Sequence, residues 1–137
     1  MTNINEFLKF GNKLADNSRK ISLSFFKKNI NVRSKSKSKF DPVTEADIST
    51  QNYINNCIKK KFPTHSIVGE EDSQIKDNKY EWCIDPIDGT RSFIIGSPTW
   101  SNLISVNYKK IPILGLVNFP ILKKYYITGA NRSSYLV

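Results

Sequence analysis

The feature that most constrains this chain is an apolar segment that runs directly into a pair of aspartates. Residues 80–84 (Tyr-Glu-Trp-Cys-Ile) are rich in aromatic and β-branched side chains, which predicts a buried strand. Residues 85–90 (Asp-Pro-Ile-Asp-Gly-Thr) follow at once. Pro86 fixes the backbone and lacks an N–H, while Gly89 permits a close backbone approach. A turn should therefore bring the two aspartates together.

Such a pair of carboxylates points to a bound cation. Asp85 and Asp88 cannot both stay ionised a few ångströms apart in a partly buried site unless a proton or a cation compensates them. The chain has 1 His and 2 Cys, which argues against zinc, whereas oxygen ligands favour Mg²⁺. The alternative is a plain surface turn, because Asp, Pro and Gly are all turn formers. The apolar strand before the turn favours the metal site.

Further carboxylates stand near the ends of other predicted elements. Glu70 and Glu71 follow Gly69 just after a short strand candidate, and Asp47 lies early in a predicted helix. Taken singly, Glu70 would be a solvated carboxylate and Asp47 a polar residue on a helix. Together with the paired aspartates they favour a metal cluster.

Hydrophobic periodicity predicts two helices followed by a sheet. Asn3 and Glu6 are spaced as a capping box for the first helix, and Thr44 can cap the second. Lys109-Lys110 and residues 120–123 are plausible turns, so the last three strands should form an antiparallel meander. The arrangement is an α+β layered architecture. The expected elements are helices over residues 3–26 and 45–61, strands over 66–68, 80–84, 100–108, 111–119 and 125–128, a loop over 70–79 and a helical turn over 91–95.

The positive charge is concentrated at one end of the chain. The formal net charge is +9, but residues 1–40 hold ten of the 21 basic residues and two of the 12 acidic ones. A nucleic-acid-binding protein is one interpretation. A Lys-rich solvated surface is favoured, because the carboxylate cluster has no use in nucleic-acid binding. Residues 33–39 form a basic loop that is either solvated or, if near the site, able to attract an anionic substrate.

The remaining composition is that of an ordinary globular protein. At 39% hydrophobic residues the chain is unlike disordered sequences, and its 137 residues suit one domain. No apolar stretch is long enough to span a membrane, and no signal peptide is visible. We therefore expect a cytoplasmic protein in which Cys57 and Cys83 are reduced and buried.

The acidic motifs resemble those of the inositol monophosphatase family, which are Mg²⁺-dependent, lithium-sensitive phosphomonoesterases. The resemblance rests on residues 41–47 (Asp-Pro-Val-Thr-Glu-Ala-Asp), 69–71 (Gly-Glu-Glu) and 82–90 (Trp-Cys-Ile-Asp-Pro-Ile-Asp-Gly-Thr). It extends over residues 5–130 in the family's order and spacing. Residues 91–100, 112–115 and Pro120 look most like the histidinol-phosphatase branch. The fold implied is the N-terminal half of a layered α-β-α-β-α sugar-phosphatase-like fold, with two helices and a mostly antiparallel sheet.

The resemblance also implies which residues bind metal. Glu70, Asp85 and the backbone carbonyl of Ile87 would hold a first Mg²⁺. Asp85 and Asp88 would hold a second Mg²⁺. Glu71 would support these ligands from beside the site.

Catalytic and substrate-binding roles follow from the same resemblance. Thr90 and Asp47 would orient or help deprotonate the attacking water, which Glu70 would hold nearby. Asp88, Gly89 and Thr90 would bind the substrate, with the phosphate received by N–H groups at the start of a helix.

The family implies a second half of about equal length, with another metal-binding Asp in a Trp-Asp-x-Ala-Ala-Gly-like motif. Residues 1–137 lack that motif, so we expect one incomplete phosphatase domain, weak or inactive alone. Its sheet should expose an edge and apolar surface that associate.

The predicted function is hydrolysis of a small phosphorylated metabolite, of the histidinol phosphate or inositol monophosphate type, by metal-activated water. The full-length protein is expected to be a homodimer without a nucleic-acid or membrane partner. The alternative is an inactive remnant that serves as a binding module.

Overall fold

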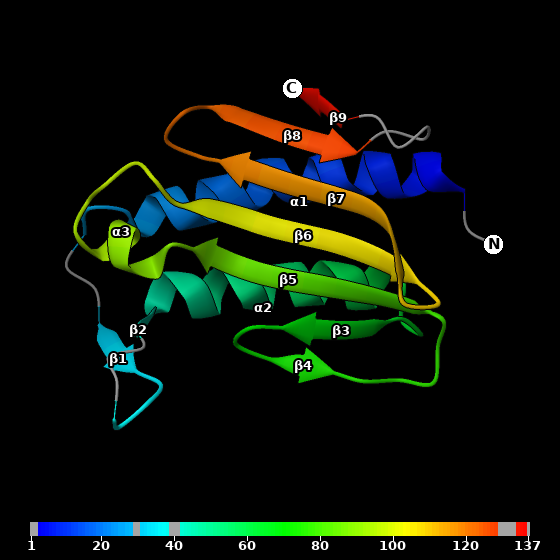
Figure 1. The fold of residues 1–137 in the computed structure, drawn as a ribbon, viewed down its shortest axis with the longest axis horizontal. Helices are drawn as coiled ribbons and strands as arrows, with labels where there is room; N and C mark the ends of the chain where they lie inside the picture. The colour runs from blue at the N-terminus through cyan, green and yellow to red at the C-terminus, as the bar shows by residue number, and fades with distance from the viewer. Residues whose placement is uncertain (1–2, 29–30, 39–41, 129–133, 137) are drawn as a thin grey trace.

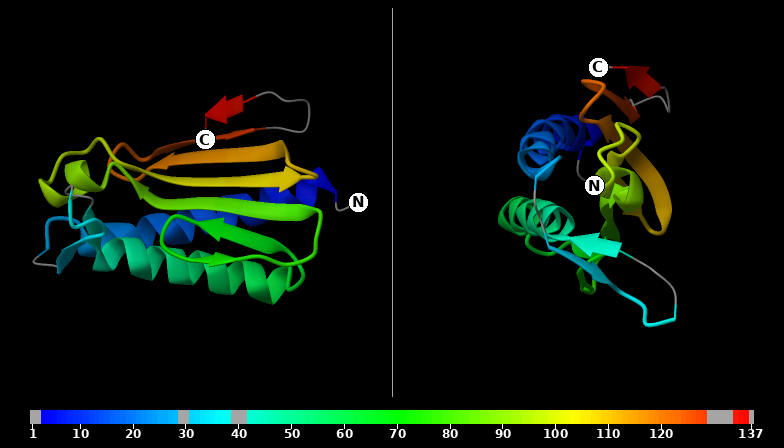
Figure 2. Two further views of the ribbon diagram at one scale, coloured as in Figure 1. Left: turned by 60° about the horizontal axis from the view of Figure 1, so that its bottom comes forward. Right: turned by 90° about the vertical axis from the view of Figure 1, so that its left-hand side faces the viewer.

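Two long helices lie side by side on one face of a seven-stranded sheet (Figures 1 and 2). The computed structural model describes residues 3–28, 31–38, 42–128 and 134–136. The helices are α1 (Ile4–Phe25), α2 (Glu45–Lys61) and the short α3 (Thr90–Ile94). The sheet has the order β4-β3-β5-β6-β7-β8-β9 and contains β3 (Ser66–Gly69), β4 (Ser73–Gln74), β5 (Tyr80–Asp88), β6 (Ser101–Tyr108), β7 (Ile111–Phe119), β8 (Lys124–Thr128) and β9 (Ser134–Leu136).

Most strand pairs in this sheet are antiparallel. The exception is the parallel pair of β3 and β5, in which Gly69 lies beside Ile84. A separate antiparallel pair, β1 (Val32–Ser34) and β2 (Pro42–Thr44), projects beside α2 (Figure 1). The predicted α+β class, both long helices and the meander of β6, β7 and β8 are confirmed.

Several predicted boundaries of strands and loops were wrong. Strand β5 continues through the acidic motif to Asp88 instead of ending at Ile84. The stretch predicted as a loop before it contains β4, and the basic segment contains β1. Lys39 of that segment and Asp41 of the first acidic motif lie outside the described residues.

Side-chain caps determine where both long helices begin. The Asn3 side chain accepts a hydrogen bond from the Asn5 N–H at 3.0 Å, while Glu6, expected to complete a capping box, forms an ion pair with Lys61 at 3.0 Å. At α2, Thr44 and Asp47 form a reciprocal capping box. This box fixes the first turn of α2, and with it the Asp47 side chain.

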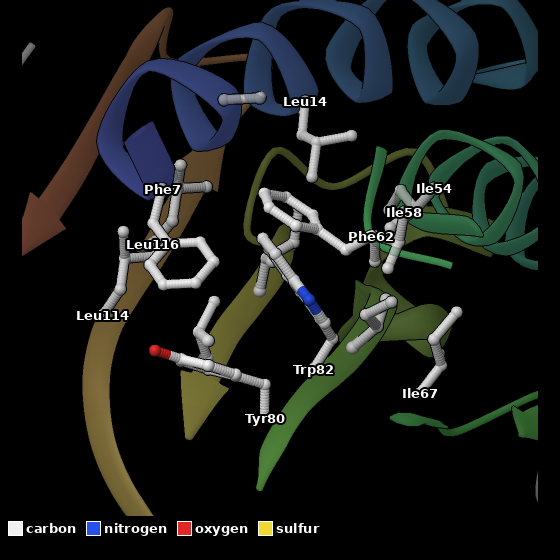
Figure 3. Packing of buried hydrophobic residues seen from close by; sticks show 14 of the residues in the cluster. Phe7, Leu14, Ile54, Ile58, Phe62, Ile67, Tyr80, Trp82, Leu114 and Leu116 are labelled. Atoms are coloured by element: carbon white, nitrogen blue, oxygen red, sulfur yellow. The ribbon is translucent and has the colours of Figure 1, made fainter. Parts of the chain in front are cut away.

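The main core lies between the two helices and the sheet (Figure 3). Trp82 of β5 is fully buried, and its ring contacts Phe7 of α1 at 5.8 Å and Phe62 after α2 at 5.6 Å between centroids. Its indole N–H donates to Nδ1 of His65 at 3.0 Å. These contacts tie β5 to both helices, so the strand that carries the aspartates is held rigidly.

A second buried cluster lies at the end of β5 and consists of Ala46, Ile87, Phe93 and Trp100. The Phe93 and Trp100 rings meet edge to face at 4.8 Å. Ile87 belongs to the acidic motif itself and is 1% exposed. Burial of its side chain therefore anchors the segment that links the two aspartates.

The opposite face of the sheet is left uncovered by the helices and strands that the structure describes (Figure 2). It has a hollow of about 650 Å³, lined in part by Val68, Leu103, Val117 and Tyr126. Tyr126 is 43% exposed and Val68 36% exposed. The expected apolar sheet surface is thus present.

Two smaller expectations can also be compared with the structure. Cys57 and Cys83 are free thiols as predicted, but both are only partly buried. None of the described helices combines the length and apolar character needed to cross a membrane.

Candidate metal centre

A bulge in β5 places the two aspartates on the same face of the sheet. Asp85 pairs with Leu103 of β6, whereas Asp88 pairs with Ser101, so β5 has one residue more than its partner across this stretch. In a regular strand, residues three apart point to opposite faces. The extra residue cancels that reversal. Asp85 is accordingly half-buried and Asp88 exposed, while both residues between them are buried.

Asp85 is the carboxylate on which the other acidic residues of the site act. Burial is the largest cause that raises the pKa of Asp85, and together with the nearby carboxylates of Glu70, Asp88 and Asp47 it brings that pKa to about 8. Its buried Oδ1 has no hydrogen-bond partner among the described residues. A buried carboxylate oxygen that lacks a donor, surrounded by other carboxylates, is a position suited to a cation.

Glu70 reaches the same place from the neighbouring strand. Because β3 and β5 are parallel and Gly69, the last residue of β3, lies beside Ile84, Glu70 comes next to Asp85. The Glu70 N–H donates to the Ile84 carbonyl at 3.0 Å, which fixes this position. A side chain at Gly69 would collide with the Asp72 carbonyl oxygen, so the turn that delivers Glu70 requires glycine.

Lys35 of the basic segment contacts the site directly. Its Nζ lies 2.8 Å from Oε1 of Glu70 and 3.5 Å from Oε1 of Glu71. Burial raises the pKa of Glu70, but the adjacent Lys35 and Asp85 outweigh it and leave that pKa below its usual value. For Glu71, burial prevails and the pKa is raised. The sequence analysis left open whether the basic loop is solvated or lies near the site, and it did not single out Lys35.

Asp47 and Thr90 form the polar wall beside the aspartates. Asp47 is 1% exposed, and its Oδ2 accepts the Thr44 N–H at 2.8 Å. The Thr90 hydroxyl lies 3.1 Å from Oδ1 of Asp47 and also 3.1 Å from the Ile87 carbonyl oxygen. Its single proton can serve one of them at a time. Burial raises the pKa of Asp47, although its hydrogen bonds oppose this.

Gly89 makes the turn between Asp88 and α3 possible. Its φ of +85° is strained for any other residue, and a Cβ there would lie 3.0 Å from the Thr99 carbonyl oxygen. Both the backbone conformation and the limited space at residue 89 therefore require glycine, as the close backbone approach predicted from the sequence implies.

The predicted site residues lie together at one end of the sheet, but their carboxylates do not form a complete set of metal ligands. Among the described residues, no three Asp, Glu, His or Cys side chains are placed to hold a metal ion by themselves. The available donors are carboxylate oxygens of Glu70, Asp85 and Asp88 and the Ile87 carbonyl. Oxygen donors of this kind suit Mg²⁺, which keeps several waters of its own. The orphaned Oδ1 of Asp85 fits the same ion.

Asn102 is the buried polar residue at this site that sequence reasoning missed. It is 0% exposed, and its Nδ2 donates to the Pro86 carbonyl oxygen at 2.7 Å. The available signal was an amide within a predicted strand, where a polar side chain needs a hydrogen-bond partner if it becomes buried.

The fold is that of the inositol monophosphatase class. Over 96% of its length this chain superposes on 51% of the IMPase of Thermotoga maritima, with a TM-score of 0.86 and 31% sequence identity. The chain belongs to the inositol monophosphatase family, whose sequence model matches residues 3–136.

Two curated relatives are also similar in sequence. The chain is 40% identical to the chloroplastic bifunctional phosphatase IMPL2 of Arabidopsis thaliana, over 98% of this chain and 39% of that protein. It is 39% identical to the histidinol-phosphatase of Chlorobaculum parvum, over 90% of this chain and 48% of that protein. The chain therefore spans about half or less of the length of these relatives.

Proposed function

We propose that this chain carries the N-terminal, metal-binding part of a Mg²⁺-dependent phosphomonoesterase. The observation that carries the proposal is the buried, unpartnered Oδ1 of Asp85 within a group of carboxylates. Family membership supports the reaction class, since the relatives described above are named as phosphatases.

In this proposal the metal ligands are those implied by the family motifs. Glu70, Asp85 and the Ile87 carbonyl would hold one Mg²⁺, and Asp85 with Asp88 would hold another. When bound, Mg²⁺ lowers the pKa of water and stabilises charge on phosphoryl oxygens. Glu71 supports Glu70 from the adjacent position.

The protein's own groups handle the proton and the phosphate. Because the Thr90 hydroxyl donates to Asp47, its oxygen can accept a proton from water while Asp47 accepts the hydroxyl proton. Asp88 and the N–H groups of Gly89 and Thr90 contact the substrate and its phosphate. Glu70 holds the attacking water near this pair.

We infer that the substrate is a small phosphate monoester of the histidinol phosphate or inositol monophosphate type. Relatives named for each of these two activities are similar to this chain. The Chlorobaculum parvum protein is a histidinol-phosphatase, and an inositol monophosphatase of Mesembryanthemum crystallinum is 34% identical over 79% of this chain. The higher identity to the first favours histidinol phosphate.

A non-catalytic binding module is the second candidate. It is favoured by the finding that, among the described residues, no three Asp, Glu, His or Cys side chains are placed to hold a metal ion by themselves, so the carboxylates could be kept without turnover. Both candidates retain the metal site, so turnover distinguishes them.

Phosphate release from histidinol phosphate and inositol monophosphate tests the proposal. The full-length enzyme should be active with Mg²⁺, inactive with EDTA and inhibited by lithium, while residues 1–137 alone should show little turnover. Asp85→Asn should abolish activity, and Asp77→Asn, an exposed loop control, should not. Wild-type turnover in Asp85→Asn would exclude the assignment.

A further inference from the structure

We propose that Asn102 is a positioning residue of the metal site, which holds the bulge of β5 in the shape that the ligands need. This inference rests on the proposed function, because it concerns how Asp85 and the Ile87 carbonyl are presented. It arises from a buried chain of hydrogen bonds on the core side of the sheet.

The bulge creates a polar group that the sheet itself does not satisfy. Pro86 and Ile87 of β5 together stand opposite Asn102, since the register passes from Leu103 to Ser101 on the partner strand. Pro86 has no N–H, and its buried carbonyl falls outside the regular ladder. The Asn102 amide donates to that carbonyl at 2.7 Å and so fills the role of the missing ladder bond.

A second amide orients the first. Asn118 of β7 is the cross-strand partner of Asn102, and its Nδ2 donates to Oδ1 of Asn102 at 3.0 Å and to the Ala15 carbonyl at 3.1 Å. Because Oδ1 of Asn102 is occupied as an acceptor, its Nδ2 faces Pro86. The Asn102 Nδ2 also lies 3.4 Å from Oγ of Ser22. Helix α1 thus contacts both asparagines, Asn102 through Ser22 and Asn118 through Ala15.

The position of the Pro86 carbonyl determines the geometry of both neighbouring ligands. Pro86 lies directly between Asp85 and Ile87, so a rotation of its peptide plane would move the Asp85 carboxylate relative to the Ile87 carbonyl. Groups that orient metal ligands by hydrogen bonding commonly change metal affinity by 10–100-fold when removed. Asn102 can act in this way although it touches neither metal nor substrate.

The test compares two buried asparagines, of which only Asn102 donates a hydrogen bond to the Pro86 carbonyl. Asn102→Leu removes the donor to Pro86. Asn118→Leu keeps that donor, because the Asn102 amide is still held by its contacts with the Pro86 carbonyl at 2.7 Å and with Oγ of Ser22 at 3.4 Å. Both are nearly fully buried, at 0% and 1% exposure, so both substitutions should lower the urea midpoint by comparable amounts. Isothermal calorimetry with Mg²⁺ should show about tenfold or weaker binding for Asn102→Leu and a change below about threefold for Asn118→Leu.

Terbium luminescence gives a readout that a purely structural role would not move. Lifetimes measured in H₂O and D₂O count the waters on a bound lanthanide, which takes the oxygen ligands that Mg²⁺ takes. Loss of the Ile87 carbonyl as a ligand should add about one water in Asn102→Leu and none in Asn118→Leu.

Equal losses of affinity in both variants, or wild-type affinity and water count in Asn102→Leu, would overturn the inference. If Asn102→Leu does not fold, Asn102→Ala removes the same donor without adding bulk or charge and is judged by the same tenfold criterion. A wild-type chain that binds neither Mg²⁺ nor terbium would instead refute the proposed function.

Discussion

Thr90 lies 3.1 Å from Oδ1 of Asp47, a residue 43 positions earlier in the chain, and its hydroxyl donates across that gap. The other oxygen of Asp47 is engaged by Thr44 in the capping box of α2. Asp47 therefore stabilises a helix and orients Thr90 at once. Substitution of Asp47 would mix loss of stability with loss of catalysis, which makes Thr90 the cleaner position to change.

Thr90→Val should lower kcat by about 100-fold in the full-length enzyme, because the hydroxyl that passes the proton is lost while the side-chain shape is kept. Mg²⁺ affinity should change little. Thr99→Val serves as the control, since Thr99 is exposed near the same turn. Unchanged kcat in Thr90→Val would remove Thr90 from the mechanism.

Lys35→Gln should tighten Mg²⁺ binding by about two- to fivefold, because an exposed ion pair is worth up to about 1 kcal/mol and Lys35 competes for the Glu70 carboxylate. Calorimetric titration measures the effect. Lys37→Gln, at an exposed lysine in the same segment, controls for general charge. The difference between the two variants should shrink at high salt. Weaker Mg²⁺ binding in Lys35→Gln would contradict the idea that Lys35 competes with Mg²⁺ for the Glu70 carboxylate.

His65 should make the protein less stable in mild acid. Its ring is stacked between Phe62 and Tyr80, and its Nδ1 accepts from Trp82 at 3.0 Å. Burial lowers the pKa of His65, so the folded state disfavours the protonated ring. The free energy of unfolding is fully retained above the ordinary pKa of about 6.5 and declines as pH falls below it.

Urea unfolding at a series of pH values measures this effect. His65→Asn keeps an acceptor for Trp82 but does not titrate in this range, so the decline between pH 7 and pH 5.5 should be smaller in the variant. The same pH dependence in both proteins would assign the decline to other groups.

The uncovered sheet face should cause this chain to self-associate. Leu103, Val117 and Tyr126 leave apolar surface around a hollow of about 650 Å³. Val117→Lys should shift sedimentation velocity profiles towards monomer at equal concentration. Ile111→Lys, at a 60% exposed position in the β6–β7 hairpin, should not. Association that is unaffected by Val117→Lys would place the contact elsewhere.

The sequence was sufficient where local chemistry decides the structure. The helical periodicity around Leu14 and Ile54 and the cap at Thr44 predicted α1 and α2, and both are present. The acidic motif predicted that Asp85 and Asp88 come together, and the bulge of β5 places both on the same face of the sheet.

What the sequence could not indicate depends on contacts between distant strands. Nothing local shows that β5 continues through Pro86, because the bulge exists only opposite Asn102. The parallel pairing that delivers Glu70 and the ion pair with Lys35 also require the tertiary fold. Short strands such as β4 have too few residues to produce a periodic signal.

Calorimetry of Mg²⁺ binding to wild type and Asp85→Asn tests the central claim most directly. Because the pKa of Asp85 is about 8, the apo carboxyl is mostly protonated at pH 7. Wild type should therefore bind Mg²⁺ more tightly as pH rises from 6 to 8 and release protons, seen as a dependence of the heat on the buffer. Asp85→Asn should bind at least about tenfold more weakly, without that pH dependence. Equal affinity and equal proton release in both proteins would contradict a metal centre at Asp85.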